Sequence, residues 1–229
     1  MNKLLSALFV LAVASVTGTA FAQTPAPAKA PAPAAGAKSI EAKVAMCVGC
    51  HGIKGYQASF PEVYKVPMIA GQSAKYITAA LVAYQKGDRK HPTMRSIADT
   101  LTEKDMADIA AYYEGLGKDP AGKLPEAADK APSPQVAALL QKAACVSCHG
   151  ANFAKPIDPS YPKIAGQHAD YMFVALKAYK TENNASVGRT NGVMGAIAKQ
   201  FSNAELKALS AYVASLQGDL KTVPEHRFR

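Results

Sequence analysis

The chain lacks several features that would assign it to common classes of protein. After residue 22 it has no long apolar run, so we expect the mature protein to be soluble and not to span a membrane. It has no cluster of Lys and Arg interleaved with aromatic residues, which argues against nucleic acid as a partner despite a net charge of +9. It has no tryptophan, and its four cysteines are confined to two short motifs. What it does have in abundance is alanine, which favours helix.

The N-terminus has the form of an export signal. Lys3 supplies a positive charge, a short apolar run covers 4–16, and 20–22 read Ala-Phe-Ala, the small-x-small form of a cleavage site. We predict a cleaved signal peptide over 1–22, with an uncleaved anchor as the alternative. Residues 23–38 alternate Pro and Ala and are predicted to form an extended leader that carries no site.

The rest of the chain repeats itself at a distance of about 100 residues, which is the size of a duplicated domain. Cys47 and Cys145 are 98 positions apart, whereas Thr102 and Ser202 are 100 apart. Thr102 and Ser202 are each the predicted N-cap of a helix, with Asp105 and Glu205 three residues on, and Ser39 is the predicted N-cap of the helix that leads to Cys47. Around these markers, apolar residues recur at helical spacing in several segments that are separated by loops. We therefore predict an all-α fold of two tandem domains, over 39–117 and 133–218, with a Pro-rich linker at 118–132 and a tail at 219–229.

The two cysteine motifs are Cys-Val-Gly-Cys-His at 47–51 and Cys-Val-Ser-Cys-His at 145–149. Both have the form C-x-x-C-H, the attachment signature of a c-type haem. Two cysteines with this spacing can form thioethers to the two vinyl groups of one porphyrin, and the adjacent histidine directs a ring nitrogen to the iron. The sequence predicts two covalent haem c groups, one held by Cys47, Cys50 and His51 and the other by Cys145, Cys148 and His149.

Each haem iron still needs a sixth ligand or an open position. Met94 and Met194 stand in equivalent predicted polar loops, each shortly before the capped last helix of its domain, and we predict them as the second axial ligands. Met46, Met106 and Met172 lie at helical spacing and are predicted to be core residues. His91 is the rival ligand in the first domain, because imidazole also binds haem iron.

Two further interpretations concern the same motifs. The carbonyls of Pro67 and Pro162 could accept a hydrogen bond from the ligating histidines, or these prolines could simply mark turns. Four cysteines in two pairs could instead form a zinc site. The pairs are almost 100 residues apart, far more than the usual zinc spacing, and zinc would leave the histidines and methionines unexplained.

Taken together, these motifs resemble a known family. The match covers about 39–217 and rests on each C-x-x-C-H, each Pro-x-Ile-Ala-Gly-Gln (67–72 and 162–167), each methionine segment and each last helix. The chain resembles dihaem cytochromes of the cytochrome c4 type, in which two class I cytochrome c domains are joined. The resemblance implies two domains related by a pseudo-twofold axis, with haem propionates near their interface, in a bacterial periplasmic carrier that can feed a terminal oxidase. One departure is that 87–94 lack the Arg-Thr-Asn found at 189–191.

The leading hypothesis is therefore a periplasmic electron carrier rather than an enzyme, because methionine closes each iron. Its expected partners are redox proteins, such as a quinol-oxidising complex as donor and a terminal oxidase as acceptor, and a partner complex could be membrane-associated. An alternative is a haem subunit of a periplasmic dehydrogenase complex. A dihaem peroxidase would need an open axial position, which the two methionines argue against.

Overall fold

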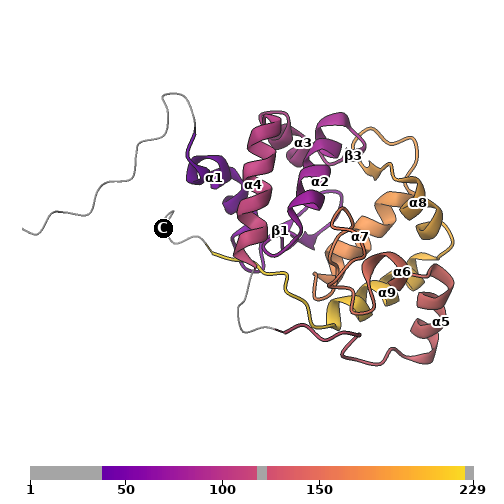
Figure 1. Cartoon of the computed structure of the whole chain (residues 1–229). Coiled ribbons are helices and arrows are strands. Elements are labelled where there is room, and N and C mark those ends of the chain that lie inside the picture. The colour runs from indigo at the N-terminus through magenta and orange to yellow at the C-terminus, as the bar shows by residue number, and fades with distance from the viewer. Residues whose placement is uncertain (1–37, 118–122, 225–229) are drawn as a thin grey trace, which may run out of the picture. The chain divides into compact units, whose positions relative to one another are not determined.

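The computed structural model describes residues 38–117 and 123–224, which we call the first half and the second half (Figure 1). The predicted signal peptide, most of the leader and the end of the tail lie outside the described residues. The first half contains α1 (Ile40–His51), β1 (Gln57–Ala58), β2 (Tyr64–Lys65), α2 (Ala74–Lys86), β3 (Arg89–Lys90), α3 (Pro92–Ala98) and α4 (Glu103–Leu116). The second half contains α5 (Pro134–Ala143), α6 (Val146–His149), α7 (Ala169–Lys180), β4 (Gly188–Arg189), α8 (Gly192–Ala198) and α9 (Asn203–Ser215).

Helices dominate both halves, as predicted, and the strands are only two residues long. The predicted helix starts are present in the local hydrogen bonds. Ser39 caps α1, and Thr102 with Asp105 forms a capping box on α4. Ser202 with Glu205 forms the equivalent box on α9. Because these side chains satisfy backbone N–H groups that have no partner within the helix, each box fixes where its helix begins.

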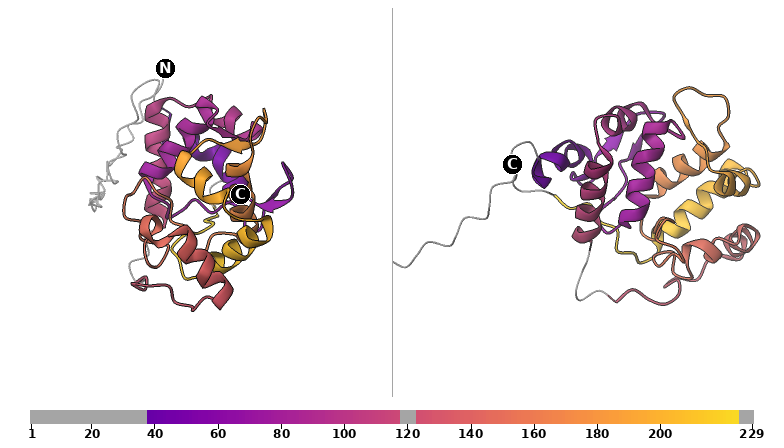
Figure 2. Two further views of the ribbon diagram at one scale, coloured as in Figure 1. Left: turned by 90° about the vertical axis from the view of Figure 1, so that its right-hand side faces the viewer. Right: turned by 45° about the horizontal axis from the view of Figure 1, so that its top comes forward.

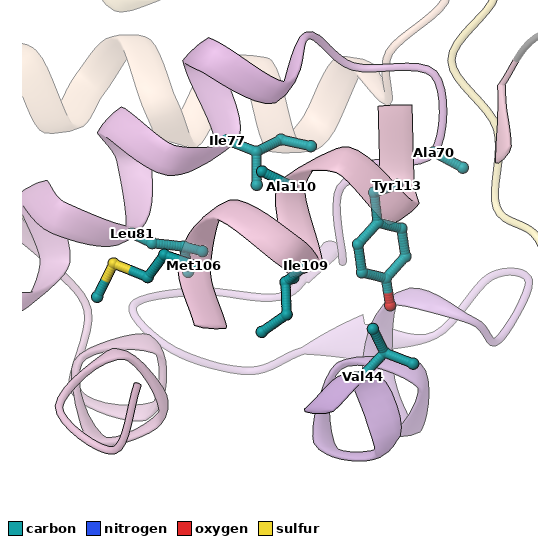
Figure 3. Close-up of a cluster of buried hydrophobic side chains, with 8 residues drawn as sticks. All are labelled: Val44, Ala70, Ile77, Leu81, Met106, Ile109, Ala110 and Tyr113. Carbon is teal, nitrogen blue, oxygen red and sulfur yellow. The ribbon is translucent and has the colours of Figure 1, made fainter. Parts of the chain in front are cut away.

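Each half is built around a pair of packed helices, α2 with α4 and α7 with α9 (Figures 1 and 2). In the first half, side chains of α1, α2 and α4 converge on one core, and Figure 3 shows Tyr113 of α4 pointing toward Val44 of α1. Met106 is fully buried there, as predicted, and Met172 is buried in the second half. These cores position the ends of α1 and α6, where the cysteine motifs lie.

Two local predictions were wrong. Met46 is 53% exposed, because it lies on the face of α1 that points away from the core. The segment before each predicted ligand is not all loop: Met94 lies in α3 and Met194 in α8. The first residues of the predicted tail pack on the rest of the chain, since Leu220 is buried and Lys221 forms a β-bridge with Ala70 of the first half.

The two halves contact each other through segments that occupy equivalent positions in each half. β3 pairs with β4 in antiparallel register, so that Arg89 lies opposite Arg189. Within 38–117 and 123–224, no helix has the length and apolar character needed to cross a bilayer.

Candidate haem sites

The histidine of each motif is held by a proline carbonyl, which confirms the predicted hydrogen bonds to the carbonyls of Pro67 and Pro162. His51 ends α1, and its Nδ1 lies 2.8 Å from the carbonyl oxygen of Pro67. His149 ends α6, and its Nδ1 lies 2.9 Å from the carbonyl oxygen of Pro162. Burial lowers the pKa of both imidazoles, so both rings are neutral at neutral pH. Since Nδ1 carries the proton that the carbonyl accepts, the lone pair of Nε2 is left for a metal.

None of the four cysteines forms a disulfide in the described part of the chain, and all four are half-buried. Before haem attachment, burial raises the pKa of the Cys47 thiol to about 11 and also raises that of the Cys145 thiol. Cys47 packs against the core of the first half, and Cys145 packs against the cores of the second. No three side chains of His, Cys, Asp or Glu converge on an ion position in the described part of the chain. The four cysteines therefore share no common ion position there, and Cys47 and Cys145 pack against different cores.

The two predicted methionine ligands occupy matching positions on α3 and α8. Both are half-buried, and Met94 packs against the same core as Cys47. The backbone N–H of Met94 donates to Nδ1 of His91, the N-cap of α3, over 3.3 Å. The backbone N–H of Met194 donates to Oδ1 of Asn191, the N-cap of α8, over 2.9 Å. His91 and Asn191 therefore occupy equivalent positions, and both act as N-cap residues.

Both ring nitrogens of His91 are already used. Because Nδ1 accepts from Met94, the proton of the neutral ring is on Nε2, which donates to the hydroxyl oxygen of Tyr64 over 3.0 Å. Burial lowers the pKa of His91, and the positive charge of Arg89 acts in the same direction, so the ring stays neutral. This arrangement weighs against His91 as a haem ligand and assigns it to holding the helix that carries Met94.

We expect His91→Asn to keep the cap and His91→Ala to lose it. Asparagine already performs this task at 191, whereas removal of an N-cap side chain typically costs about 1 kcal/mol of stability. Chemical denaturation should therefore rank the two variants, with alanine the less stable, and both should keep the optical spectrum of the haems. Loss of the low-spin spectrum of one haem in His91→Asn would show that His91 is a ligand.

Comparison with known proteins decides the family. A family model described as Cytochrome c matches 33–116 and again 135–217. Cytochrome c4 of Stutzerimonas stutzeri is 30% identical over 94% of this chain and 100% of its own length. The crystal structure of reduced cytochrome c4 from Pseudomonas stutzeri is 27% identical, with a TM-score of 0.58 over 78% of this chain and 97% of that one. The chain belongs to the cytochrome c family, and within it to the cytochrome c4 type.

A further relative has a name that specifies a donor. The protein named thiosulfate dehydrogenase electron acceptor of Thiomonas intermedia is 33% identical over 76% of this chain and 79% of its own length. Two cytochrome c domains in one chain carry two covalent haem c groups, and the cytochrome c4 type transfers electrons rather than catalysing a reaction.

The side chains of this cytochrome c4-type protein fit two haems in one respect that the sequence did not reveal. Arg89 and Arg189 lie side by side between the halves, surrounded by tyrosines. Arg89 donates to the hydroxyls of Tyr76 and Tyr171, and Arg189 also donates to Tyr171. Among the described residues neither guanidinium has a carboxylate partner, and the buried Nε of Arg89 has no acceptor at all. Two paired positive charges with an unused donor match a ligand that brings carboxylates.

Sequence reasoning missed these arginines and two buried glutamines, although all four follow the repeat. Arg89 and Arg189 are 100 positions apart, like Met94 and Met194. The residues at 89–91 read Arg-Lys-His where 189–191 read Arg-Thr-Asn, so the departure noted in the sequence is smaller than it appeared. The two glutamines, Gln72 and Gln167, are the last residues of the repeated Pro-x-Ile-Ala-Gly-Gln. The spacing of that repeat alone could have marked them as a pair.

Proposed function

We propose that this chain is a periplasmic carrier that takes single electrons from a respiratory donor, such as a quinol-oxidising complex, and delivers them to an acceptor such as a terminal oxidase. The observation that carries the proposal is the same in both halves. A neutral histidine has its Nδ1 hydrogen-bonded to a proline carbonyl, and a half-buried methionine lies on a capped short helix. A site with histidine and methionine on both sides of the iron leaves no coordination position for a substrate.

The proposal assigns a role to each residue of the two sites. Cys47 and Cys50 would tether one haem, and Cys145 and Cys148 the other. The axial pairs would be His51 with Met94 and His149 with Met194. The haem, when bound, supplies a one-electron couple. The thioether of methionine is a soft ligand that favours Fe(II), so these chain residues would give both centres comparatively high potentials.

Arg89 and Arg189 would compensate the negative charge of haem propionates between the halves. Guanidinium groups bind carboxylates through parallel N–H bonds, and the Nε of Arg89 has no acceptor among the described residues. Directly opposed like charges destabilise a strand pair unless an anion lies near both of them. Shared compensation at this position would keep the two haem edges close, which suits exchange of an electron between them.

A second candidate donor has specific support. The relative in Thiomonas intermedia is named for accepting electrons from thiosulfate dehydrogenase, so a periplasmic dehydrogenase is a concrete alternative to a quinol-oxidising complex. With that donor, the chain would act as the haem-carrying partner of the dehydrogenase. The residues proposed to hold the two haems would be the same.

The two donors are separated by a reduction assay on the purified oxidised holoprotein. With a quinol and a membrane fraction that contains the quinol-oxidising complex, we expect both haems to be reduced within seconds, and oxygen uptake to follow when a terminal oxidase is added. Thiosulfate with a thiosulfate dehydrogenase serves as the second arm. Fast reduction only in that arm would replace the quinol complex by the dehydrogenase, and reduction in neither arm would contradict both. Recovery of the holoprotein with the cytoplasmic fraction would contradict the periplasmic location.

A further inference from the structure

Two buried glutamines, Gln72 and Gln167, each reach across to the backbone of the other half. Both side chains are only 4% exposed. Nε2 of Gln72 donates to the carbonyl oxygen of Lys163 over 3.0 Å, and the backbone N–H of Lys163 donates back to Oε1 of Gln72 over 3.0 Å. Nε2 of Gln167 donates to the carbonyl oxygen of Met68 over 2.9 Å, and the backbone N–H of Met68 donates back to Oε1 of Gln167 over 3.0 Å. We call these two reciprocal arrangements the glutamine clasps.

Each clasp is held at several points, because each glutamine amide makes three hydrogen bonds and the backbone before it is fixed. Oε1 of Gln72 also accepts from the backbone N–H of Ser73, and Oε1 of Gln167 also accepts from the backbone N–H of His168. The preceding glycines, Gly71 and Gly166, have φ of +86° and +74°, a left-handed conformation that favours glycine. Their N–H groups donate to carbonyls of the last helix in each half, those of Tyr113 and Val213.

The clasped residues directly follow the prolines that hold the axial histidines. The carbonyl of Pro67 and the N–H of Met68 belong to one peptide group. That group accepts from His51 on one side and donates to Gln167 on the other. The carbonyl of Pro162 and the N–H of Lys163 form the equivalent group, between His149 and Gln72. The histidine of each half is therefore connected, through a single peptide group, to a glutamine of the other half.

We propose that Gln167 and Gln72 are positioning residues that lower the reduction potential of the haem in the opposite half. The inference rests on the proposed ligation by His51 and His149. A peptide whose N–H is hydrogen-bonded is polarised, so its carbonyl is a stronger acceptor for a second hydrogen bond. A stronger acceptor at Nδ1–H makes the imidazole a more basic ligand, which stabilises Fe(III).

The test uses three glutamine-to-methionine variants of the holoprotein, since methionine has a similar length but makes none of these hydrogen bonds. Gln167→Met removes the clasp on Met68, and Gln72→Met removes the clasp on Lys163. Gln85→Met is the matched control, because Gln85 donates to the carbonyls of Ala98 and Leu101 within its own half, and neither peptide group that bonds a histidine is among these partners. Two quantities are measured: hydrogen exchange of the Met68 and Lys163 amides, and the potential of each haem from a redox titration followed by its shifted NMR signals.

In Gln167→Met we expect the Met68 amide to lose protection and the equilibrium constant for reduction of the first haem to rise about twofold to threefold. For one electron this corresponds to about 20–30 mV. The second haem should be unaffected, Gln72→Met should show the mirror result, and Gln85→Met should shift neither haem. Lost amide protection without a shift of the opposite haem, or an equal shift of both haems, would overturn the inference.

This outcome is distinguishable from failure of the ligand assignment. A wrong assignment appears already in the unmodified protein, as spectra without a methionine-to-iron band. The clasp inference is decided only by comparing variants. Should one glutamine variant not fold, the other still decides the question, because β3–β4 and the bridge between Ala70 and Lys221 connect the halves independently of either clasp.

Discussion

Replacement of Met94 by alanine is expected to remove about half of the far-red absorption band that arises from thioether-to-iron charge transfer. Met194→Ala should remove the other half, and the double variant should have none. Alanine cannot reach the metal, so the affected iron is left with an open position and loses the ligand that favours Fe(II). Its potential should fall, and it should gain affinity for carbon monoxide in the reduced state, as measured by optical titration.

Met46→Ala is the matched control for these variants. Met46 lies on α1 beside the first cysteine motif but is 53% exposed, so its removal should leave the band, the potentials and the stability unchanged. A full band in Met94→Ala or in Met194→Ala would show that another side chain ligates that haem. Carbon monoxide binding by the unmodified protein would argue that one iron is open and would revive the peroxidase interpretation.

Arg89→Leu is expected to lower the potentials of both haems. The guanidinium lies between the halves next to Arg189, and loss of a positive charge near an iron favours the ferric state. For a charge roughly 10 Å away at an effective dielectric constant of about 20, the effect is about 1–2 kcal/mol. That equals roughly 40–90 mV for one electron. Redox titration at two salt concentrations measures the shift, which should resist screening because the group is buried.

Two further variants separate charge from geometry. Arg89→Lys keeps the charge but cannot reproduce the fork that bonds Tyr76 and Tyr171, so it should retain most of the potential while losing stability. Arg95→Leu removes an exposed charge on α3 that pairs with Asp99, and solvent should screen its effect almost completely. An equal shift in Arg95→Leu and Arg89→Leu would contradict a specific role for the buried arginine.

The sequence predicted those parts of the molecule that depend on local chemistry. The capping boxes at Thr102 and Ser202 and the helix start at Ser39 follow from side chains that bond the backbone a few residues away. The carbonyls of Pro67 and Pro162 were also found, because a ligating histidine needs an acceptor and proline fixes the nearby backbone. The hydrogen-bond partner is a few residues away in the chain in the case of the helix caps, and it is required by the ligating histidine in the case of the prolines.

The remaining features depend on which segments meet after folding. Gln72 bonds Lys163, 91 positions away, and no local pattern specifies that contact. Arg89 and Arg189 meet only because β3 and β4 pair. The short helix at Met94 was mistaken for loop because Pro92 and the polar residues before it are typical of turns, whereas here proline takes the first helical position.

The bridge between Ala70 and Lys221 has a consequence for the order of assembly. The backbone N–H of Lys221 donates to the carbonyl of Ala70, next to Gly71, and Val223 packs against the core of the first half. A chain that emerges from its N-terminus presents that half long before residues 219–224 exist. The core of the first half is therefore completed only after the whole second half has been made, because a segment that follows α9 packs against helices that precede α5.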